Sequence, residues 1–288
     1  MLTSRRRPGM TLVELLVALA LAAIVLGAAT SSSLRQQRSH ANIIAGTDAD
    51  AQIRAATLVL AGQLDLLDPM VGDLVQGEAQ DTAMQVRAPI AQSLACTREI
   101  GAATLLPDVP GSVGVGGAVS TPRAGDTLWW LADTAWHAER IVGANSVRSA
   151  CANGLGAGQT TQLILGGRDT IDGGAPLRVT RQTRYSIYLA SDGTHQLGVR
   201  EWNDSTHRFA APQPVAGPLL ARNGTRRTGF RYFDASGAEL TTASGPIDVR
   251  SVARIRITAQ SVVAVRSAPG PSVRVDSVDV ALHHAVGH

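Results

Sequence analysis

The chain has 288 residues, of which 44% are hydrophobic, 3% aromatic and 17% charged, and its formal net charge is +3. All 26 basic residues are arginines, and three of them lie in the first seven positions, so the rest of the chain is close to neutral. Because a near-neutral chain lacks the basic surface that nucleic acids attract, composition gives no support for a nucleic-acid-binding protein.

A basic leader and an apolar segment open the chain. Arg5, Arg6 and Arg7 precede Gly9, and residues 10–29 then contain Glu14 as their only charged side chain. About twenty helical residues span about 30 Å, the thickness of a bilayer's hydrocarbon core. The sequence therefore predicts a transmembrane helix over residues 10–29, with the N-terminus in the cytoplasm because the arginines precede it.

The leader differs from a secretory signal peptide, which is cut after its apolar region at small residues. Here the small residue, Gly9, lies before the apolar region. A cut between Gly9 and Met10 would remove residues 1–9 and leave the apolar helix in the mature protein.

The run Gly9-Met-Thr-Leu-Val-Glu14-Leu-Leu16 resembles the class III signal of type IV pilins and pseudopilins. In that family a membrane-embedded prepilin peptidase cuts after the glycine and methylates the new amino terminus. The resemblance implies that Gly9 precedes the cut, that Met10 is methylated and that Glu14 is the first-turn glutamate of the family. Methionine at position 10 is a tolerated departure from the commoner phenylalanine.

Glu14 is costly inside a membrane, by about 2.5–3.5 kcal/mol near a helix centre and by less near its end. Once the leader is removed, the free amine of Met10 can pair with it, on the same helix or on a neighbouring subunit. The alternative is that Glu14 reaches the headgroups and favours the positive N-terminus of the helix. The resemblance favours a role for Glu14 in recruiting the subunit during assembly.

Helical spacing continues beyond the membrane segment, so residues 30–68 are predicted to form an amphipathic extension of the helix. Its distal part should pack on a globular head and its proximal part on other helices. Asp68-Pro69 is the expected end, with Ser31–Ser33 and Gly46 as weak points. The predicted apolar face consists of Leu34, Ala41, Ile44, Ala45, Ala51, Ala55, Leu58, Val59 and Gly62.

Residues 69–288 change to period-two spacing and β-branched side chains, which predicts a β-rich head. The whole chain is then an α+β fold: a long N-terminal helix, transmembrane in its first half, packed on an antiparallel β-sheet head, as in type IV pilins. The glycine-rich stretch Gly101–Gly125 is a candidate partner surface. The candidate strands are Met84–Arg87, Thr127–Leu131, Trp136–Val142, Thr161–Leu165, Leu177–Leu189, Gln196–Trp202, Thr228–Phe233, Val249–Ala259 and Val273–Leu282.

Two cysteines, Cys96 and Cys151, lie beyond the predicted membrane span. An exported head is in an oxidising compartment, so an even pair is interpreted as one disulfide, worth about 4 kcal/mol for a loop of this length. Two buried free thiols are the alternative.

Residues for catalysis or for cofactor binding are not apparent. No Gly-x-Ser-x-Gly elbow occurs, and Ser, His and Asp are scattered. The tail histidines His283, His284 and His288 lack accompanying carboxylate or cysteine ligands, so we predict no metal, no cofactor and no enzyme. The four tryptophans are interpreted as core or sheet-face residues, with a platform for stacking sugars or bases as the alternative; they are Trp129, Trp130, Trp136 and Trp202.

Parts of the head follow one another in an order similar to the W-type minor pilins of type IV pili and to the J-type pseudopilins of type II secretion. These parts are Tyr185–Leu189, Leu197–Glu201, Gly229–Gly237 and Val249–Ile257. A head of this size favours the W type. The resemblance implies a non-catalytic minor pilin of the tip or initiation complex. A J-type pseudopilin is the first alternative, and a membrane-anchored periplasmic binding domain or enzyme with an uncut leader is the second.

The partners that the resemblance implies are prepilin peptidase, other minor and major pilins, and platform proteins of the bacterial inner membrane. The expected location is the inner membrane with a periplasmic head, and later the pilus tip.

Overall fold

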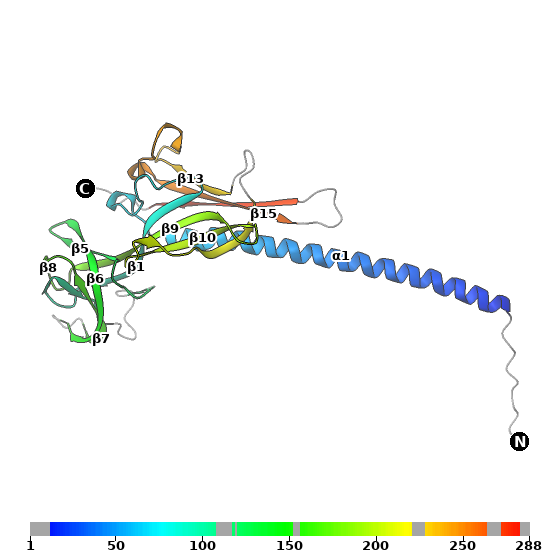
Figure 1. Ribbon diagram of the computed structural model, residues 1–288, viewed down its shortest axis with the longest axis horizontal. Helices are drawn as coiled ribbons and strands as arrows, with labels where there is room; N and C mark the ends of the chain where they lie inside the picture. The colour runs from blue at the N-terminus through cyan, green and yellow to red at the C-terminus, as the bar shows by residue number, and fades with distance from the viewer. Residues whose placement is uncertain are drawn as a thin grey trace, which may run out of the picture. The chain divides into compact units, whose positions relative to one another are not determined.

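The computed structural model describes residues 12–107, 117–118, 120–151, 156–220, 228–263 and 272–282. Over these residues it contains one α-helix, α1 (Leu12–Leu64), followed by β-strands (Figure 1). Contacts divide the chain into two units, with boundaries after Asp50, Ser261 and Arg274. A long apolar helix followed by an antiparallel β-sheet domain confirms the predicted α+β class and is consistent with a pilin-like fold.

The largest sheet has ten strands, and every described register between neighbouring strands is antiparallel. Its central path runs β11-β10-β9-β5-β6-β7-β3, while β1 and β12 pair with β9 and β10, and β4 pairs with β1. The strands are β1 (Ala83–Leu94), β3 (Ala102–Thr104), β4 (Gly117–Ala118), β5 (Thr127–Ala132), β6 (Ala135–Ala150), β7 (Ala157–Leu165), β9 (Pro176–Leu189), β10 (His195–Asn203), β11 (Arg208–Phe209) and β12 (Gln213–Leu219).

Two smaller sheets complete the described strands. One has the order β14-β13-β15-β16, from β13 (Gly229–Phe233), β14 (Glu239–Leu240), β15 (Arg254–Val263) and β16 (Ser272–Ala281). The other joins β2 (Glu99–Ile100) to β8 (Thr170–Ile171). Short 3-10 helices occupy Pro69–Val71, Thr242–Ser244 and Val249–Ser251.

Strand β9 has different partners along its two edges. One edge pairs with β1 from Pro176 to Ser186. The other edge pairs with β5 up to Thr180 and with β10 from Thr183 onward. Between these two partners, Arg181 and Gln182 have their described cross-strand neighbours on β1 alone. The sheet is therefore split along one edge of its central strand.

Two apolar cores lie along the sheet. The first forms where the last turns of α1 meet β1, β9, β10, β13 and β15, around fully buried side chains such as Leu60, Met84 and Tyr185. The second lies among β1, β3, β5, β6, β7 and β9, around Leu128 and Leu163. Within the strands, core side chains recur two positions apart, as at Ile255 and Ile257 in the first core and Leu177 and Val179 in the second, as the β period requires.

The buried face of α1 in the head differs from the predicted one. The buried apolar side chains after Asp50 are Ile53, Ala56, Leu60 and Leu64, whereas Leu58 remains 65% exposed. This segment is apolar on more than one face, so spacing alone allowed two overlapping stripes. The stripe with the larger side chains at its centre is the one that packs on the sheet.

The helix also ends earlier than predicted, at Leu64 rather than beside Pro69. Leu67 N donates to Leu64 O at 3.0 Å, which closes a tight turn. Asp68 instead caps the 3-10 helix that follows, since its carboxylate accepts from Met70 N at 2.9 Å. The helix continues through Ser31–Ser33 and Gly46 without a break.

Six of the nine predicted strands lie within observed strands, several of which are longer, and two others extend one residue beyond the observed strand. Thr228 precedes β13 and Leu282 follows β16. The prediction for Val249–Ala259 is wrong at its start, because Asp248 caps a 3-10 turn there by accepting from Arg250 N at 3.1 Å. The stretch Gly101–Gly125 contains β3 and β4, and its residues 108–116 and 119 lie outside the described residues.

Candidate functional site

The first half of α1 carries a continuous exposed apolar surface. Each side chain from Leu12 to Gln37 is exposed. Among the described residues, α1 is the one helix long and apolar enough to cross a membrane, by length and composition. Its large apolar side chains here are Leu12, Val13, Leu15, Leu16, Val17, Leu19, Leu21, Ile24, Val25, Leu26 and Leu34.

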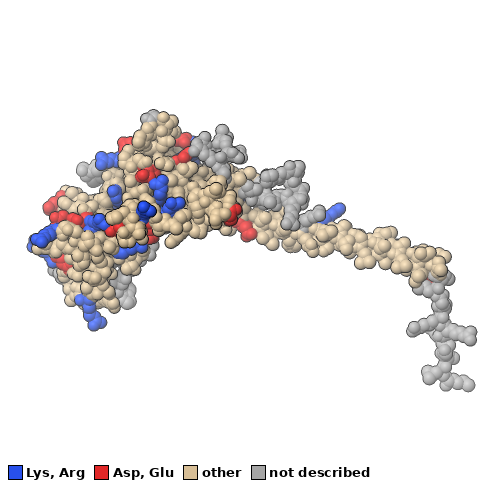
Figure 2. All heavy atoms as spheres, in the orientation of Figure 1, with Lys and Arg blue, Asp and Glu red and all other residues tan. Residues whose placement is uncertain are grey.

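Exposing a surface of this kind to water is unfavourable, and soluble proteins rarely expose large contiguous apolar patches. Figure 2 shows no charged side chain on the visible face of the N-terminal part of α1. This segment fits a membrane anchor and also offers apolar area for packing against other helices.

Glu14 lies in the first turn of α1 and is exposed. It is the only charged residue of the helix before Arg35. Gly9 and Met10, the predicted cleavage and methylation positions, lie outside the described residues, as do the tail histidines His283, His284 and His288.

Polar residues mark the end of the apolar segment without interrupting the helix. The Thr30 hydroxyl donates to Leu26 O at 2.9 Å, and the Ser31 hydroxyl donates to Ala28 O at 2.9 Å. Because these hydroxyls are satisfied by the carbonyls of the preceding turn, they are compatible with an apolar environment.

In the head, Cys96 and Cys151 form a disulfide. Cys96 follows β1 and is fully buried, and Cys151 follows β6. The bond closes a loop with a sequence separation of 55 residues and ties the chain after β1 to the chain after β6.

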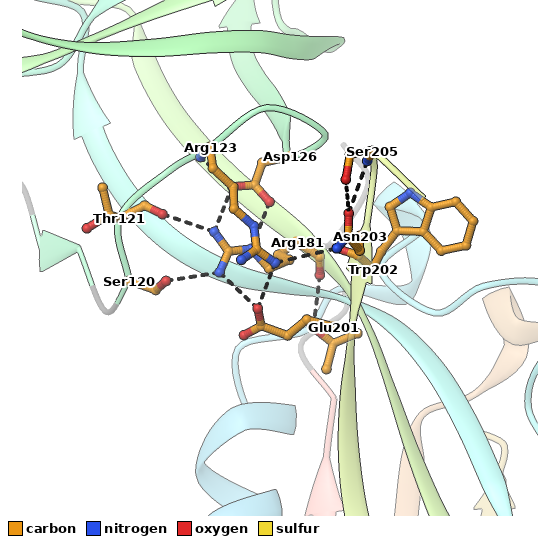
Figure 3. Close-up of polar contacts among 10 residues, drawn as sticks. Ser120, Thr121, Arg123, Asp126, Arg181, Glu201, Trp202, Asn203 and Ser205 are labelled. Carbon is orange, nitrogen blue, oxygen red and sulfur yellow. Dashed lines mark hydrogen bonds and ion pairs between the residues drawn. The ribbon is translucent and has the colours of Figure 1, made fainter. Parts of the chain in front are cut away.

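A buried ionic cluster fills the split edge of β9 (Figure 3). Arg181 Nε and Nη2 donate to the two oxygens of Asp126 at 2.8 and 2.9 Å, and Arg181 Nη1 lies 3.3 Å from Glu201. Arg181 also donates to Ser120 Oγ at 3.1 Å and to Thr121 O at 3.0 Å. The hydrogen bond to Asp126 is the main reason that the pKa of the Arg181 guanidinium is raised, against the desolvation that lowers it.

A second buried pair joins Asp73, which follows the 3-10 helix Pro69–Val71, to Arg178 of β9. Asp73 is fully buried, and its Oδ2 accepts from Arg178 Nη2 at 2.5 Å and from Asp68 N at 2.8 Å. Its Oδ1 has no hydrogen-bond partner among the described residues. Burial therefore raises the pKa of the Asp73 carboxyl, although Arg178 acts in the opposite direction.

Neither cluster was identified from the sequence. The signal that the sequence offered is the recurrence of Arg178, Arg181 and Arg184 at every third residue of one strand. Their partners are far away in the chain, so the pairing itself could not be read from spacing. Both clusters hold loops against the sheet, and over the described residues no three His, Cys, Asp or Glu side chains come together as metal ligands would.

The comparison with protein families matches residues 4–30 to the prokaryotic N-terminal methylation motif. That motif marks prepilin-like structural subunits, which a prepilin peptidase processes and which assemble with other pilins. No curated protein and no solved structure matches the chain. The motif, the membrane-compatible helix and the β-sheet domain together indicate a type IV pilin-like or pseudopilin-like protein.

Proposed function

We propose that this protein is a minor pilin of a type IV pilus, a non-catalytic subunit of the tip or initiation complex. The observation that carries the proposal is an apolar helix, exposed from Leu12 to Gln37, that directly follows the cleavage point of a prepilin methylation motif. The same helix can be held in a membrane and then transferred into a bundle of like helices.

Assembly then proceeds in stages. Prepilin peptidase removes residues 1–9, frees the amine of Met10 and methylates it. Residues 10–29 hold the subunit in the inner membrane, with residues 69–288 as a periplasmic head and residues 30–68 between them. Platform proteins of the inner membrane then move the subunit into the growing fibre, whose tip lies outside the cell.

In our proposal, Glu14 favours the transfer of the subunit from the membrane into the fibre. A carboxylate that leaves lipid for the amine of Met10, on its own or a neighbouring subunit, gains a charge-assisted hydrogen bond in a dry environment. Apolar contacts around Leu12, Leu15 and Leu19 replace the lipid contacts that are lost, so recruitment does not require a net hydrophobic gain.

The head contributes selectivity rather than chemistry. Its two apolar cores, disulfide and buried ion pairs keep a fixed surface for neighbouring major and minor pilins. A rigid surface loses less conformational entropy when it binds a neighbouring subunit.

The test is a clean deletion with complementation, scoring sheared surface pili and secreted proteins from the same cultures. Loss of pili with normal secretion supports a minor pilin. Normal pili with blocked secretion would instead indicate a J-type pseudopilin, which shares the same N-terminal motif.

N-terminal mass spectrometry of the protein from membranes addresses the remaining alternative. We expect a mature chain that begins at methylated Met10. A chain that retains Met1, or an unmodified Met10, would favour an anchored periplasmic binding domain or enzyme over a pilin.

A further inference from the structure

The split edge of β9 opens a cleft on the face of the sheet opposite to Arg181. Consecutive residues of a strand point to opposite faces, so Gln182 points away from the Arg181 cluster. The cleft has a volume of about 310 Å³, and its floor includes Thr127, Thr180 and Gln182. Arg87, the cross-strand neighbour of Gln182 on β1, lines one side.

The end of β10 and the turn after it form the opposite wall. Trp202, Asp204 and His207 line this side, and Arg140 of β6 forms an ion pair with Asp204. A Cβ at Gly125 would lie 2.4 Å from Asp204 Cβ, so glycine at this position allows the turn to approach the start of β5. The wall is therefore held in place by packing and charge.

The cleft carries a positive charge that no carboxylate neutralises among the described residues. Arg140 is paired with Asp204, but Arg87 has no ion pair there and donates to Gly72 O instead. The Arg87 guanidinium lies 5.9 Å from the centre of the Trp129 ring, which fixes its position without removing its charge. A guanidinium in this state binds carboxylates and phosphates by paired hydrogen bonds.

Neutral hydrogen-bonding groups accompany the charge. The side-chain amide of half-buried Gln182 makes no hydrogen bond to another described residue. The Thr180 hydroxyl is buried and accepts from Trp129 Nε1 at 3.0 Å, which holds the Trp129 ring beside Arg87. The Gln182 amide, with one acceptor and two donors, matches the hydroxyls of a polyol.

An aromatic surface completes the site. Trp202 is half-buried and is held edge-on by Phe209, with ring centres 5.2 Å apart. Figure 3 shows its indole ring pointing away from Arg181 and Glu201. An indole beside polar groups suits a ligand with one apolar and one polar face.

We propose that this cleft binds an acidic sugar residue, such as a uronic acid unit of an anionic polysaccharide. The sugar carboxylate pairs with Arg87, its hydroxyls bond to Gln182 and Asp204, and its ring packs against Trp202. Nucleic acid fits less well, because a chain of phosphates calls for a row of free cations, and the described lining of this cleft offers Arg87 alone. The site lies entirely in the head and does not depend on the role proposed for α1.

The test is calorimetric titration of the full-length protein in a detergent without a sugar headgroup. The probes are D-glucuronate, D-glucose and a single-stranded oligodeoxynucleotide. We expect saturable glucuronate binding with a Kd on the order of 1 mM, since so small a ligand makes few contacts. Glucose should bind about tenfold more weakly, because it lacks the carboxylate.

Variants locate the binding. Arg87→Gln should weaken glucuronate binding about tenfold, and Gln182→Ala about fivefold. Gln182→Ala is the variant expected to fold normally, because the Gln182 side chain makes no hydrogen bond to another described residue. Arg250→Gln, at an exposed arginine in the 3-10 helix Val249–Ser251, is the matched control and should bind as the wild type does.

Three results would overturn the proposal. One is equal affinity for glucose and glucuronate, and another is unchanged glucuronate binding in both Arg87→Gln and Gln182→Ala. The third is tight binding of the oligonucleotide, lost in Arg87→Gln, with no binding of glucuronate.

Discussion

Arg181 and Asp126 form a two-point ion pair in the interior of the head, with only 4% and 2% of their surfaces exposed. The pair joins the middle of β9 to the residue before β5, at the place where the pairing of β9 with β5 has ended and its pairing with β10 has not yet begun. It lies between the two apolar cores. A charge pair thus occupies the position where the ladder of backbone hydrogen bonds is interrupted.

Replacing Arg181 by methionine should destabilise the head by about 3–5 kcal/mol, because Asp126 would remain buried without its counter-charge. Urea unfolding followed by tryptophan fluorescence measures the loss. Arg98→Met is the matched control, since Arg98 and Asp172 form a pair that is 74% and 76% exposed and should contribute at most about 1 kcal/mol.

The double variant Arg181→Met/Asp126→Leu extends this test. It removes both charges and should recover much of the lost stability, as buried pairs replaced by apolar side chains often do. If Arg181→Met cost no more than Arg98→Met, the pair would not have the structural role assigned to it.

Local patterns predicted the parts of this protein that depend on neighbouring residues. The apolar run with one carboxylate at Glu14 identified both the helix and the type of signal, because length and polarity decide membrane insertion. The edge strand β12 was missed because Pro214 and Pro218 interrupt its strand pattern, although prolines are tolerated at sheet edges.

Other features could not be predicted because they depend on tertiary contacts. The buried face of α1 was wrongly predicted because Ala55 and Ala56 are equivalent in a pattern and differ only once the sheet is present. The Arg181–Asp126 pair joins residues 55 positions apart, so no local spacing indicates it. The cleft depends on the same tertiary arrangement, though Trp202 had been noted as a possible stacking residue.

The disulfide should contribute about 4 kcal/mol to the stability of the head, since it closes a loop with a sequence separation of 55 residues. A Cys96→Ala/Cys151→Ala variant should show this loss in urea unfolding. Wild-type protein unfolded in the presence of dithiothreitol should lose a similar amount. Equal stability of the oxidised protein and the double variant would contradict the assignment.

Asp73 should make the head more stable as the pH falls toward the ordinary carboxyl pKa of 3.8. Burial raises its pKa in the folded protein, so the folded state binds the proton more tightly than the unfolded state does. Stability from this group is then greatest below pH 3.8 and declines as the pH rises through the raised folded value. Asp73→Asn should remove this slope, measured by urea unfolding at several pH values.

Asp279 supplies the control of opposite sign. Its pKa is lowered chiefly by the hydrogen bond from Arg256, so its contribution is present above pH 3.8 and is lost as the pH falls through the lowered folded value. Asp279→Asn should therefore flatten a slope that rises with pH. Identical pH profiles for the two variants would rule out the environment described for Asp73.

Glu14→Ala should leave membrane insertion and leader removal intact while reducing incorporation into pili by about tenfold or more. Insertion depends on the apolar run, which the substitution makes more apolar, and cleavage takes place on the other side of Met10. A lost charge-assisted hydrogen bond of about 1.5–3 kcal/mol accounts for the reduction. Immunoblots of membranes and of sheared pili measure membrane insertion and incorporation into pili separately.

Thr30→Ala is the control for this prediction. It removes a polar group from the same helix and should assemble normally, because the Thr30 hydroxyl bonds only within the helix. Incorporation of Glu14→Ala at the wild-type level would contradict the recruitment role and favour the alternative that Glu14 only reaches the headgroups.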